Sequence, residues 1–395
     1  MELSKNYQRI DAAMFSQLME SMSTPGLINF GGGSLDSALL PSQTLSELSA
    51  RLLSDDGARL LQYGAAQGLA EMLDAHLQYL AEYRSLKAAR EELLIVNGGT
   101  QGIDLACQTV LNEGDTVLVE APTFLVIFML LQRLNVRCIG VQTDENGMVP
   151  EDLREKMERY HPKMLYVIPT FQNPSGAVTS LRRRQEIYAL AQRYDVCILE
   201  DDPYYDLRYE GQPLPMLRSM DEDGRVISLS SYSKIISPGL RVGAVCAPHR
   251  IIAAMTAVKQ GCDMHTPSLN QALCAEYVRS GALRGHIDRL CAENRKKRDG
   301  MLAHIRRCFP EKTAYVKPQG GLFLWLCLPE EIPVDALFTR AIREHGVAYI
   351  PGSAFYPENM RTARCIRLNF ACTGEQQTKE GIEYLGALFS GYRPS

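Results

Sequence analysis

Short apolar runs rich in β-branched residues alternate with amphipathic segments of helical length through the middle of the chain. Such alternation is typical of a mainly parallel sheet that is covered by helices on its faces. It predicts a large α/β domain over residues 50–285. The expected strands are LLIVN (93–97), TVLVE (116–120), VRCIGV (136–141), MLYVI (164–168), VCILE (196–200), RVISLS (225–230) and VGAVCA (242–247), with helices near 100–112, 123–134, 150–159 and 180–194.

The order of elements changes after a segment rich in Arg, Lys, Glu and Leu, residues 282–307, which is expected to be a connecting helix. Beyond it, short strand-like runs and two helix-like segments form a compact α+β pattern. A chain of 395 residues exceeds the size that one hydrophobic core usually reaches. We therefore predict a smaller C-terminal domain over residues 286–395, to which the N-terminal segment, residues 1–49, contributes.

Composition excludes several classes of partner. The net charge of −4 gives no electrostatic reason for binding nucleic acid or an anionic membrane. No uncharged apolar run reaches the roughly 20 residues that span a bilayer, and acidic residues near the N-terminus do not fit a secretory signal. We interpret the Arg182-Arg183-Arg184 run at an expected helix start as a solvated helix face rather than a phosphate site.

The cysteines and histidines point to a reduced, metal-free protein. Eleven cysteines form no CxxC pair and lie mostly inside apolar runs, and seven histidines form no HExxH-like cluster. This pattern indicates buried thiols in a reducing compartment rather than a disulfide framework or a zinc site. We therefore expect a cytoplasmic protein without a structural metal.

A glycine-rich turn, NGGTQG (97–102), joins an expected strand to an expected helix. Glycines allow a ligand to approach the backbone closely, and the free amides at a helix start bind anions such as phosphate. The alternative is an ordinary tight turn. The spacing fits neither the P-loop nor the dinucleotide-binding motif.

Polar residues also follow the next expected strands, where open α/β sheets present their ligand-binding groups. Asn173, in LYVIPTFQNPSG, is suited to a polar contact, or it is only a turn residue before proline. Three acids end the strand in ILEDDPYY (198–205). These acids suit a protonated organic cofactor better than a metal, which would need more ligands nearby; a helix cap or loop pair is the alternative.

The stretch SLSSYSKIISPGLRVG (228–243) carries only two charges, Lys234 and Arg241, among small, hydroxylic and apolar residues. A desolvated lysine amine has a lowered pKa, attacks aldehydes and acts as a general base. Arg241 is a permanent cation suited to a phosphate. A lysine that merely extends to solvent at a domain edge is the alternative reading of this stretch alone. Together with the polar residues that follow the other expected strands, Lys234 and Arg241 are predicted to form one site.

These motifs resemble the fold-type I pyridoxal-phosphate aminotransferases. The resemblance runs from about Gly26 to Phe389 and is carried by PTFQNPSG, EDDPYY, SYSK followed by PGLRVG, and RLNF. It is closest to the class I/II branch of 2-aminoadipate, kynurenine and aromatic aminotransferases and the aminotransferase-like domains of MocR regulators. The resemblance implies an aspartate aminotransferase-like fold, the cofactor pyridoxal 5′-phosphate (PLP) and a homodimer with shared active sites.

For the cofactor ring, the resemblance implies that Lys234 forms a Schiff base with the aldehyde of PLP. Asp201 would pair with the pyridine nitrogen and keep it protonated. Asn173 and Tyr204 would hydrogen-bond the phenolic oxygen of the ring. Phe124, in EAPTF, is similar to the residue that stacks on the ring face.

For the phosphate and the substrate, the resemblance assigns a second set of residues. Arg367, in RCIRLNF, would bind the α-carboxylate of the substrate together with Asn173, and Gly33 would close over the substrate as part of an N-terminal lid. Two stretches depart from the pattern: GGGSLD in the lid, and FLVIFML after Phe124. The phosphate would be held by Gly99, Thr100, Ser231 and Arg241, and by Tyr63 of LLQYG from the neighbouring subunit.

The implied activity is transfer of the amino group of an aromatic, branched-chain or 2-aminoadipate-like amino acid to a 2-oxo acid such as 2-oxoglutarate, by a ping-pong mechanism with Lys234 as the base. A lyase, decarboxylase or carbon–carbon bond-forming synthase on the same fold stays open, because the cofactor-binding groups do not choose which Cα bond breaks. A PLP-binding regulator would need an N-terminal DNA-binding domain, for which we expect no room. Ser231-x-x-Lys234 as the serine-nucleophile motif is rejected, because the required KTG and SDN-like triplets are missing.

Overall fold

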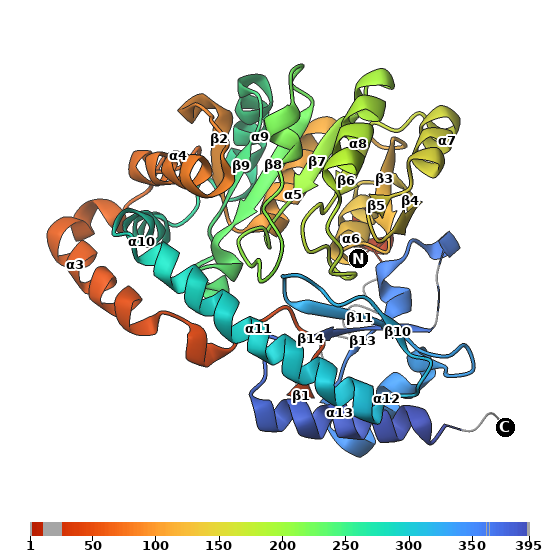
Figure 1. The fold of residues 1–395 in the computed structure, drawn as a ribbon. Coiled ribbons are helices and arrows are strands. Elements are labelled where there is room, and N and C mark those ends of the chain that lie inside the picture. The colour runs from red at the N-terminus through yellow and green to blue at the C-terminus, as the bar shows by residue number, and fades with distance from the viewer. Residues whose placement is uncertain (1, 11–25, 361, 363, 393–395) are drawn as a thin grey trace.

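The computed structural model describes residues 2–10, 26–360, 362 and 364–392. Figure 1 shows a large sheet with helices on both sides, and a smaller sheet that is packed beside the helices α11 (Ala282–Cys308) and α13 (Glu375–Ser390). The predicted α/β architecture, with a mainly parallel sheet and a smaller α+β part at the C-terminus, is confirmed. The domain boundaries at residues 49 and 285 stay predictions.

The large sheet has eight strands in the order β2-β9-β8-β7-β6-β3-β4-β5. Its central strands from β8 to β4 are parallel, whereas β9 runs antiparallel to both of its neighbours and β5 antiparallel to β4. Parallel strands at the centre are buried on both faces, which explains their continuous apolar runs. All seven expected strands are present. The bounds are β2 Leu93–Val96, β3 Thr116–Ala121, β4 Arg137–Asp144, β5 Gly147–Met148, β6 Met164–Val167, β7 Cys197–Asp201, β8 Val226–Ser231 and β9 Gly243–Cys246.

Helices cover both faces of this sheet (Figure 1). Alternate strand residues pack against α5, α6 and α9 on one face and against α7 and α8 on the other, so two apolar cores flank the sheet. The four expected helices are present as α5 to α8. Their bounds, with those of the helices that the sequence did not predict, are α3 Ser42–Leu60, α4 Ala70–Arg84, α5 Gly99–Val110, α6 Val126–Arg133, α7 Pro150–Tyr160, α8 Leu181–Arg193, α9 His249–Cys262 and α10 Ser268–Arg279; a short α1 covers Lys5–Gln8.

The smaller sheet has the order β10-β11-β14-β13, with β11 and β14 antiparallel. The N-terminal strand β1 pairs in parallel with β12, so residues from the start of the chain lie beside its C-terminal part. The contribution of residues 1–49 to a small domain stays a prediction. The bounds are β1 Ile28–Asn29, β10 Ala314–Tyr315, β11 Phe323–Cys327, α12 Val334–His345, β12 Val347–Ala348, β13 Ile350–Pro351 and β14 Cys365–Asn369.

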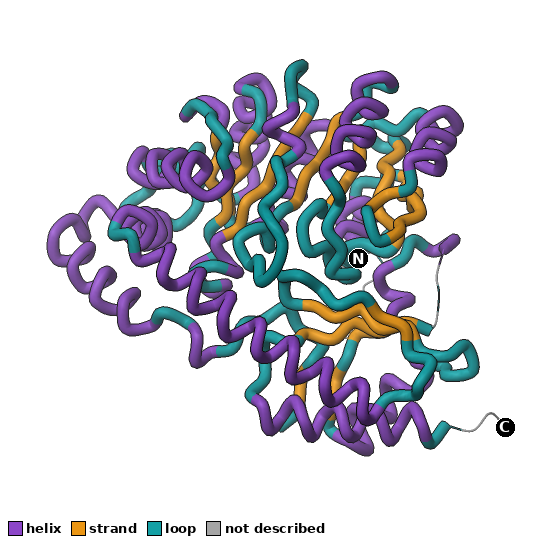
Figure 2. The backbone as a smooth tube through the Cα atoms, in the orientation of Figure 1, coloured by secondary structure: helices purple, strands orange, loops and turns teal. Residues whose placement is uncertain are grey.

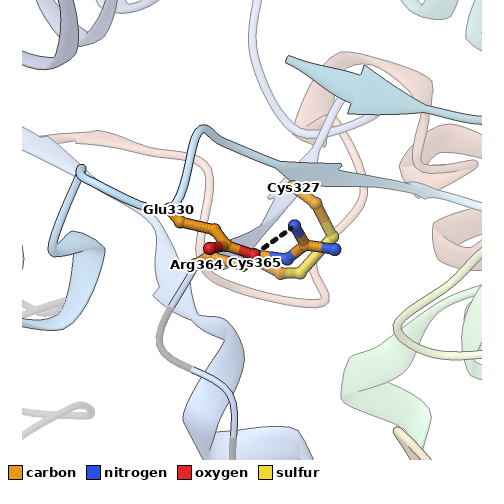
Figure 3. The surroundings of a disulfide bond; sticks show 4 residues. All are labelled: Cys327, Glu330, Arg364 and Cys365. Carbon is orange, nitrogen blue, oxygen red and sulfur yellow. Dashed lines mark ion pairs between the residues drawn. A yellow bond between two sulfur atoms is a disulfide. The ribbon is translucent and has the colours of Figure 1, made fainter. Parts of the chain in front are cut away.

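A disulfide joins Cys327 and Cys365 (Figure 3), so the expectation of reduced thiols is wrong for these two residues. They are 38 residues apart in sequence, but the register of β11 against β14 makes them direct neighbours, with 4.0 Å between their Cα atoms. Directly opposed residues of an antiparallel pair are near enough to form a disulfide, and the sequence does not reveal the register. The other nine cysteines are free.

The interpretation of the arginine run at the start of α8 as a solvated helix face is wrong, because only Arg182 is strongly exposed. Arg184 is fully buried and donates hydrogen bonds to the carbonyl oxygens of Thr179 and Pro169. A planar guanidinium with five donors satisfies loop carbonyls that would otherwise be buried without partners. Arg184 therefore stabilises the loop after β6 instead of forming a solvated face. In the described part of the chain, no helix combines the length and apolar character needed to cross a membrane.

Candidate active site

A cavity of about 580 Å³ lies at the C-terminal ends of the parallel strands. Figure 2 shows loops filling the space between the large sheet and the smaller one, and the loops after β6, β7 and β8 contribute to the cavity wall. Open α/β sheets bind their ligands at this edge. The cavity brings together eleven of the twelve site residues that were expected from the sequence: Gly33, Gly99, Thr100, Phe124, Asn173, Asp201, Tyr204, Ser231, Lys234, Arg241 and Arg367.

One end of the cavity is an anion-binding cradle. Gly98 precedes α5 with a φ of +80°, and a Cβ atom there would lie 2.3 Å from a guanidinium nitrogen of Arg241, so the position requires glycine. The Nη2 atom of Arg241 donates to the carbonyl oxygen of Asn97 at 3.0 Å. The first amides of α5, from Gly99 onward, have no partner within the helix. A cation and a helix N-terminus thus face the same space.

A buried carboxylate lies in the middle of the cavity. Asp201 ends β7, and its Oδ2 atom accepts a hydrogen bond of 2.7 Å from the hydroxyl of Tyr166 on β6. Burial raises the pKa of Asp201 to about 6, and the hydrogen bond from Tyr166 acts in the opposite direction. Tyr204 is buried beside it, and burial raises the pKa of that phenol as well.

Lys234 lies on the floor of the cavity in the short turn Tyr232–Lys234 that follows β8. Its Nζ atom donates to the carbonyl oxygen of Gly33 at 2.7 Å. Burial, and then the positive charges of Arg367 and Arg241, lower the pKa of this amine to about 8. An appreciable fraction of Lys234 is therefore an uncharged nucleophile near neutral pH.

Arg367 projects into the cavity from β14 of the smaller sheet. It is buried, and its two terminal nitrogens donate to Oδ1 of Asn173, at 2.8 Å, and to the carbonyl oxygen of Gly31. The guanidinium stacks 4.1 Å from the ring centre of Phe323. Burial lowers its pKa to about 10, which still leaves the side chain charged at neutral pH. The result is a fixed, two-pronged cation for a carboxylate.

The segment that was predicted to form a lid is part of the cavity lining. Residues 31–34 line the wall, and the side-chain amide of Asn369 donates to the carbonyl oxygens of Gly32 and Ser34 at 2.8 and 2.9 Å. The stretch FLVIFML, which departs from the family pattern, has residues in two different places. Leu125 and Val126 line the cavity, whereas Ile127 is buried in the core against the large sheet.

Tyr63 is the one expected site residue that the structure does not bring into the cavity. Its side chain is 77% exposed and contacts the ring of His265 edge-on, with 5.8 Å between the ring centres. Sequence reasoning missed Tyr166, Phe323 and Ile350 near the cavity. Tyr166 had one available signal, a hydroxyl-bearing ring within the apolar run LYVI, since buried tyrosines usually direct the hydroxyl to a partner.

Residues 25–385 match the family described as aminotransferase class I and II. The chain belongs to this family. The enzyme is 32% identical over 379 residues to "Aromatic-amino-acid aminotransferase 1" of Thermococcus litoralis, covering 95% of this chain and 90% of that one. It is 33% identical to the "2-aminoadipate transaminase" of Thermus thermophilus, and the match covers 98% of this chain and 96% of that one. The crystal structure of Pyrococcus horikoshii kynurenine aminotransferase in complex with PMP superposes with a TM-score of 0.93, at 32% identity and with 98% and 97% of the chains covered.

The enzyme is therefore a PLP-dependent aminotransferase of fold type I, and the cavity fits this cofactor. The cradle at α5 suits a phosphate, and the Asp201 carboxylate suits a protonated ring nitrogen. The amine of Lys234, with its lowered pKa, suits an aldehyde. When bound, PLP withdraws electrons from the Cα atom of the substrate. Among the described residues no cluster of three metal-ligating side chains is found.

Proposed function

We propose that this aminotransferase moves the amino group of an α-amino acid with an aromatic, branched-chain or 2-aminoadipate-like side chain to a 2-oxo acid such as 2-oxoglutarate, by a ping-pong mechanism. The proposal is carried by the presence of Lys234 and Arg367 in one cavity. Arg367 offers two donors to an α-carboxylate and also lowers the pKa of Lys234. One buried cation thus orients the substrate and keeps the reacting amine uncharged.

In this proposal Arg367 binds the α-carboxylate, which replaces the carbonyl oxygen of Gly31 as its partner. Asn173, already bonded to Arg367, fixes the orientation of the guanidinium. Lys234 would hold the cofactor through its amine. When that amine is free and uncharged, it would act as the base that takes the proton from the Cα atom of the substrate and later gives it up as the acid. Residues 31–34 exclude water from the reacting atoms.

The remaining site residues would bind the cofactor. Asp201 would hold the ring nitrogen, while Asn173 and Tyr204 would hydrogen-bond the phenolic oxygen and Phe124 would cover the ring face. A carboxylate that pairs with the ring nitrogen favours its protonated form. The phosphate would be bound by Gly99, Thr100, Ser231 and Arg241, and by Tyr63 of a partner subunit.

The second subunit is part of the proposal because Tyr63 does not reach the cavity of its own chain. Leu61, Tyr63 and Met264 are strongly exposed, at 74%, 77% and 59%, and the contact of Tyr63 with His265 links the two segments. Exposed apolar residues gathered in this way favour a protein interface. We infer a cytoplasmic homodimer with shared active sites, without a nucleic acid or a membrane as partner.

Two relatives, named for aromatic amino acids and for 2-aminoadipate, support the proposed range of donors. Leu125, Val126 and Ile350 give one wall of the cavity an apolar surface. Apolar and aromatic donor side chains can be buried against this wall.

A panel of amino donors with 2-oxoglutarate as the acceptor tests the proposal when both glutamate and ammonia are measured. Glutamate without ammonia is the expected result. Ammonia or pyruvate release would instead establish a lyase and contradict it. Adding PLP should also produce a visible absorbance band. Borohydride should remove this band and leave the cofactor permanently attached to Lys234, and the Lys234→Ala variant should show neither result. Wild-type protein that shows no band would overturn the assignment of Lys234.

A further inference from the structure

Tyr166 is a buried side chain that the proposed mechanism does not use. It lies on β6 with no exposed surface, and its ring packs in the core between the sheet and the helices α5, α6 and α9. Its hydroxyl donates to Oδ2 of Asp201 at 2.7 Å. The parallel register explains this contact, because β6 and β7 are neighbours in the sheet and Tyr166 pairs with Leu199, two residues before Asp201.

The bond leaves Asp201 with one fixed oxygen and one for a ligand. Asp201 lines the cavity and its Oδ2 atom accepts the hydrogen bond from Tyr166, whereas none of the described residues donates a hydrogen bond to its Oδ1 atom. Without a second anchor, a carboxylate at a strand end rotates about its terminal torsion, which has a broad energy minimum. The phenol removes this freedom.

The electrostatic surroundings of Asp201 make the same bond decisive for its charge. Glu120 on β3 and Tyr204 on the loop after β7 both interact electrostatically with Asp201, and neither supplies a positive charge. Burial favours the neutral acid, and burial also raises the pKa of Glu120 to about 8, so Glu120 is mostly uncharged at pH 7. The donated hydrogen bond from Tyr166 is the contact that favours the ionised form of Asp201.

We propose that Tyr166 is a positioning residue for the cofactor: its hydroxyl fixes the Asp201 carboxylate, aims the free oxygen at the ring nitrogen and keeps that carboxylate ionised. The inference rests on the proposed role of Asp201. It predicts that an enzyme without this hydroxyl retains Lys234 and Arg367 but binds a less protonated cofactor ring. The electron-withdrawing power of the ring falls as a result.

Tyr166→Phe tests the inference, because it removes one oxygen atom and keeps the packed ring. The matched control is Tyr349→Phe, which removes a buried hydroxyl that donates to the carbonyl oxygen of Val334 in the smaller α+β part. Circular dichroism first establishes that both variants are folded. Protonation of the ring is then read from the ¹⁵N chemical shift of PLP labelled at the ring nitrogen, and affinity from titration of the cofactor-free protein.

In Tyr166→Phe we expect a ring-nitrogen signal that moves toward the unprotonated value at pH 7.5 and a PLP affinity roughly tenfold lower, a typical loss for a hydrogen bond to a charged group. The low-pH limit of PLP binding should move to higher pH, because losing the bond raises the pKa of Asp201. Tyr349→Phe should match wild type in all three measurements. In an Asp201→Asn background, Tyr166→Phe should have little further effect, since no charge is left to stabilise.

A Tyr166→Phe variant with the wild-type ¹⁵N shift, affinity and pH limit would overturn the inference. So would an undiminished effect of Tyr166→Phe in the Asp201→Asn background. These measurements use no amino acid, so they separate the inference from the proposed function. Wild-type protein that binds no PLP contradicts the proposed function itself, whereas wild-type binding with an unaffected Tyr166→Phe variant contradicts only the role of Tyr166.

Discussion

At the scale of single residues, the reactivity of Lys234 depends on the cations around it. Burial disfavours its charged form, and Arg367 and Arg241 add electrostatic repulsion to that effect. Because these causes lower the pKa of Lys234 to about 8, covalent attachment of PLP to cofactor-free protein should speed up as the pH rises to about 8. Below that pH the rate should fall by about tenfold for each pH unit. Stopped-flow absorbance, with borohydride trapping at Lys234, measures this profile.

Replacing Arg367 with methionine removes one of these positive charges. The amine of Lys234 then holds its proton more tightly, so its pKa rises and the attachment profile moves to higher pH. Arg364→Met is the control, because Arg364 lies three residues away but is half-exposed and pairs with Glu330 at 3.7 Å (Figure 3). A profile of Arg367→Met that stays in place, or that moves to lower pH, contradicts this account of Lys234.

The residues of the cavity differ in how far the sequence predicted them. Asn173, Asp201 and Lys234 follow apolar runs, and strand ends at one sheet edge bring such residues together. Tyr166 was missed because it lies inside a strand, and its partner is set by the register of β6 against β7. Tyr63 was expected from the resemblance alone, and in this structure it is exposed and does not line the cavity.

At the scale of elements, helix α9 holds the loop that precedes α5. Lys259, fully buried on α9, forms an ion pair of 2.6 Å with Asp263 just beyond the helix end. Oδ2 of Asp263 in turn accepts hydrogen bonds from the side chains of Asn97 and Gln101, at 2.5 and 2.6 Å. Arg241 donates to the same loop. The cradle is thus fixed before any anion arrives, which reduces the entropy cost of binding.

Lys259→Met should weaken binding of both PLP and inorganic phosphate by roughly tenfold, as removing a supporting partner of a binding site commonly does. The variant leaves the carboxylate of Asp263 without its cation, close to the bound anion. Asp263→Asn removes that negative charge, so the double variant should bind phosphate more tightly than Lys259→Met alone. Isothermal titration measures both ligands.

The control for this cycle is Arg340→Met, which breaks an exposed ion pair with Glu344. It should leave both affinities unchanged, because an exposed pair on α12 contributes little to any site. Equal phosphate affinity in wild type and Lys259→Met would show that the ion pair does not support the cradle.

Elements marked by a continuous apolar run or by an amphipathic pattern were predicted well, and elements without such a mark were not. The strands β2 to β4 and β6 to β9 agree with their apolar runs, because strands buried within the sheet carry few polar residues. Helix α10 was missed for a physical reason. Leu273, Cys274, Ala275, Tyr277 and Val278 are all buried, so no regular polar face marks the helix. The Cys327–Cys365 pairing depends on strand register, which composition does not encode.

At the scale of the whole molecule, segments far apart in sequence meet at one cavity. β14 presents Arg367 from the smaller sheet, the large sheet presents Asp201 and Lys234, and the N-terminal residues 31–34 lie between them. β1 pairs with β12, and Asn369 at the end of β14 donates hydrogen bonds to the carbonyl oxygens of Phe30 and Gly32, so this N-terminal segment lies beside β14. Movement of the smaller sheet relative to the larger one would therefore displace Arg367 and residues 31–34 together.

In the proposed site Tyr63 comes from a second copy of the chain, and subunit mixing tests this proposal directly. Tyr63→Ala and Lys234→Ala are each expected to lose activity, the first through weaker phosphate binding and the second completely. If each site takes Lys234 from one chain and Tyr63 from the other, a mixed dimer contains one site with both changes and one with neither. Mixing the two variants after mild denaturation and refolding should then restore activity above the sum of the separate variants.

Lys234→Ala mixed with Arg367→Met provides the control, because both residues line the same cavity of one chain. Every site of that mixed dimer carries one of the two changes, so no wild-type site forms and activity should stay low. If each site instead used Tyr63 of its own chain, the mixture of Tyr63→Ala with Lys234→Ala would also contain no wild-type site, and its activity would stay low. Failure of Tyr63→Ala and Lys234→Ala to restore activity, when light scattering shows that mixed dimers have formed, would place the complete site within a single subunit.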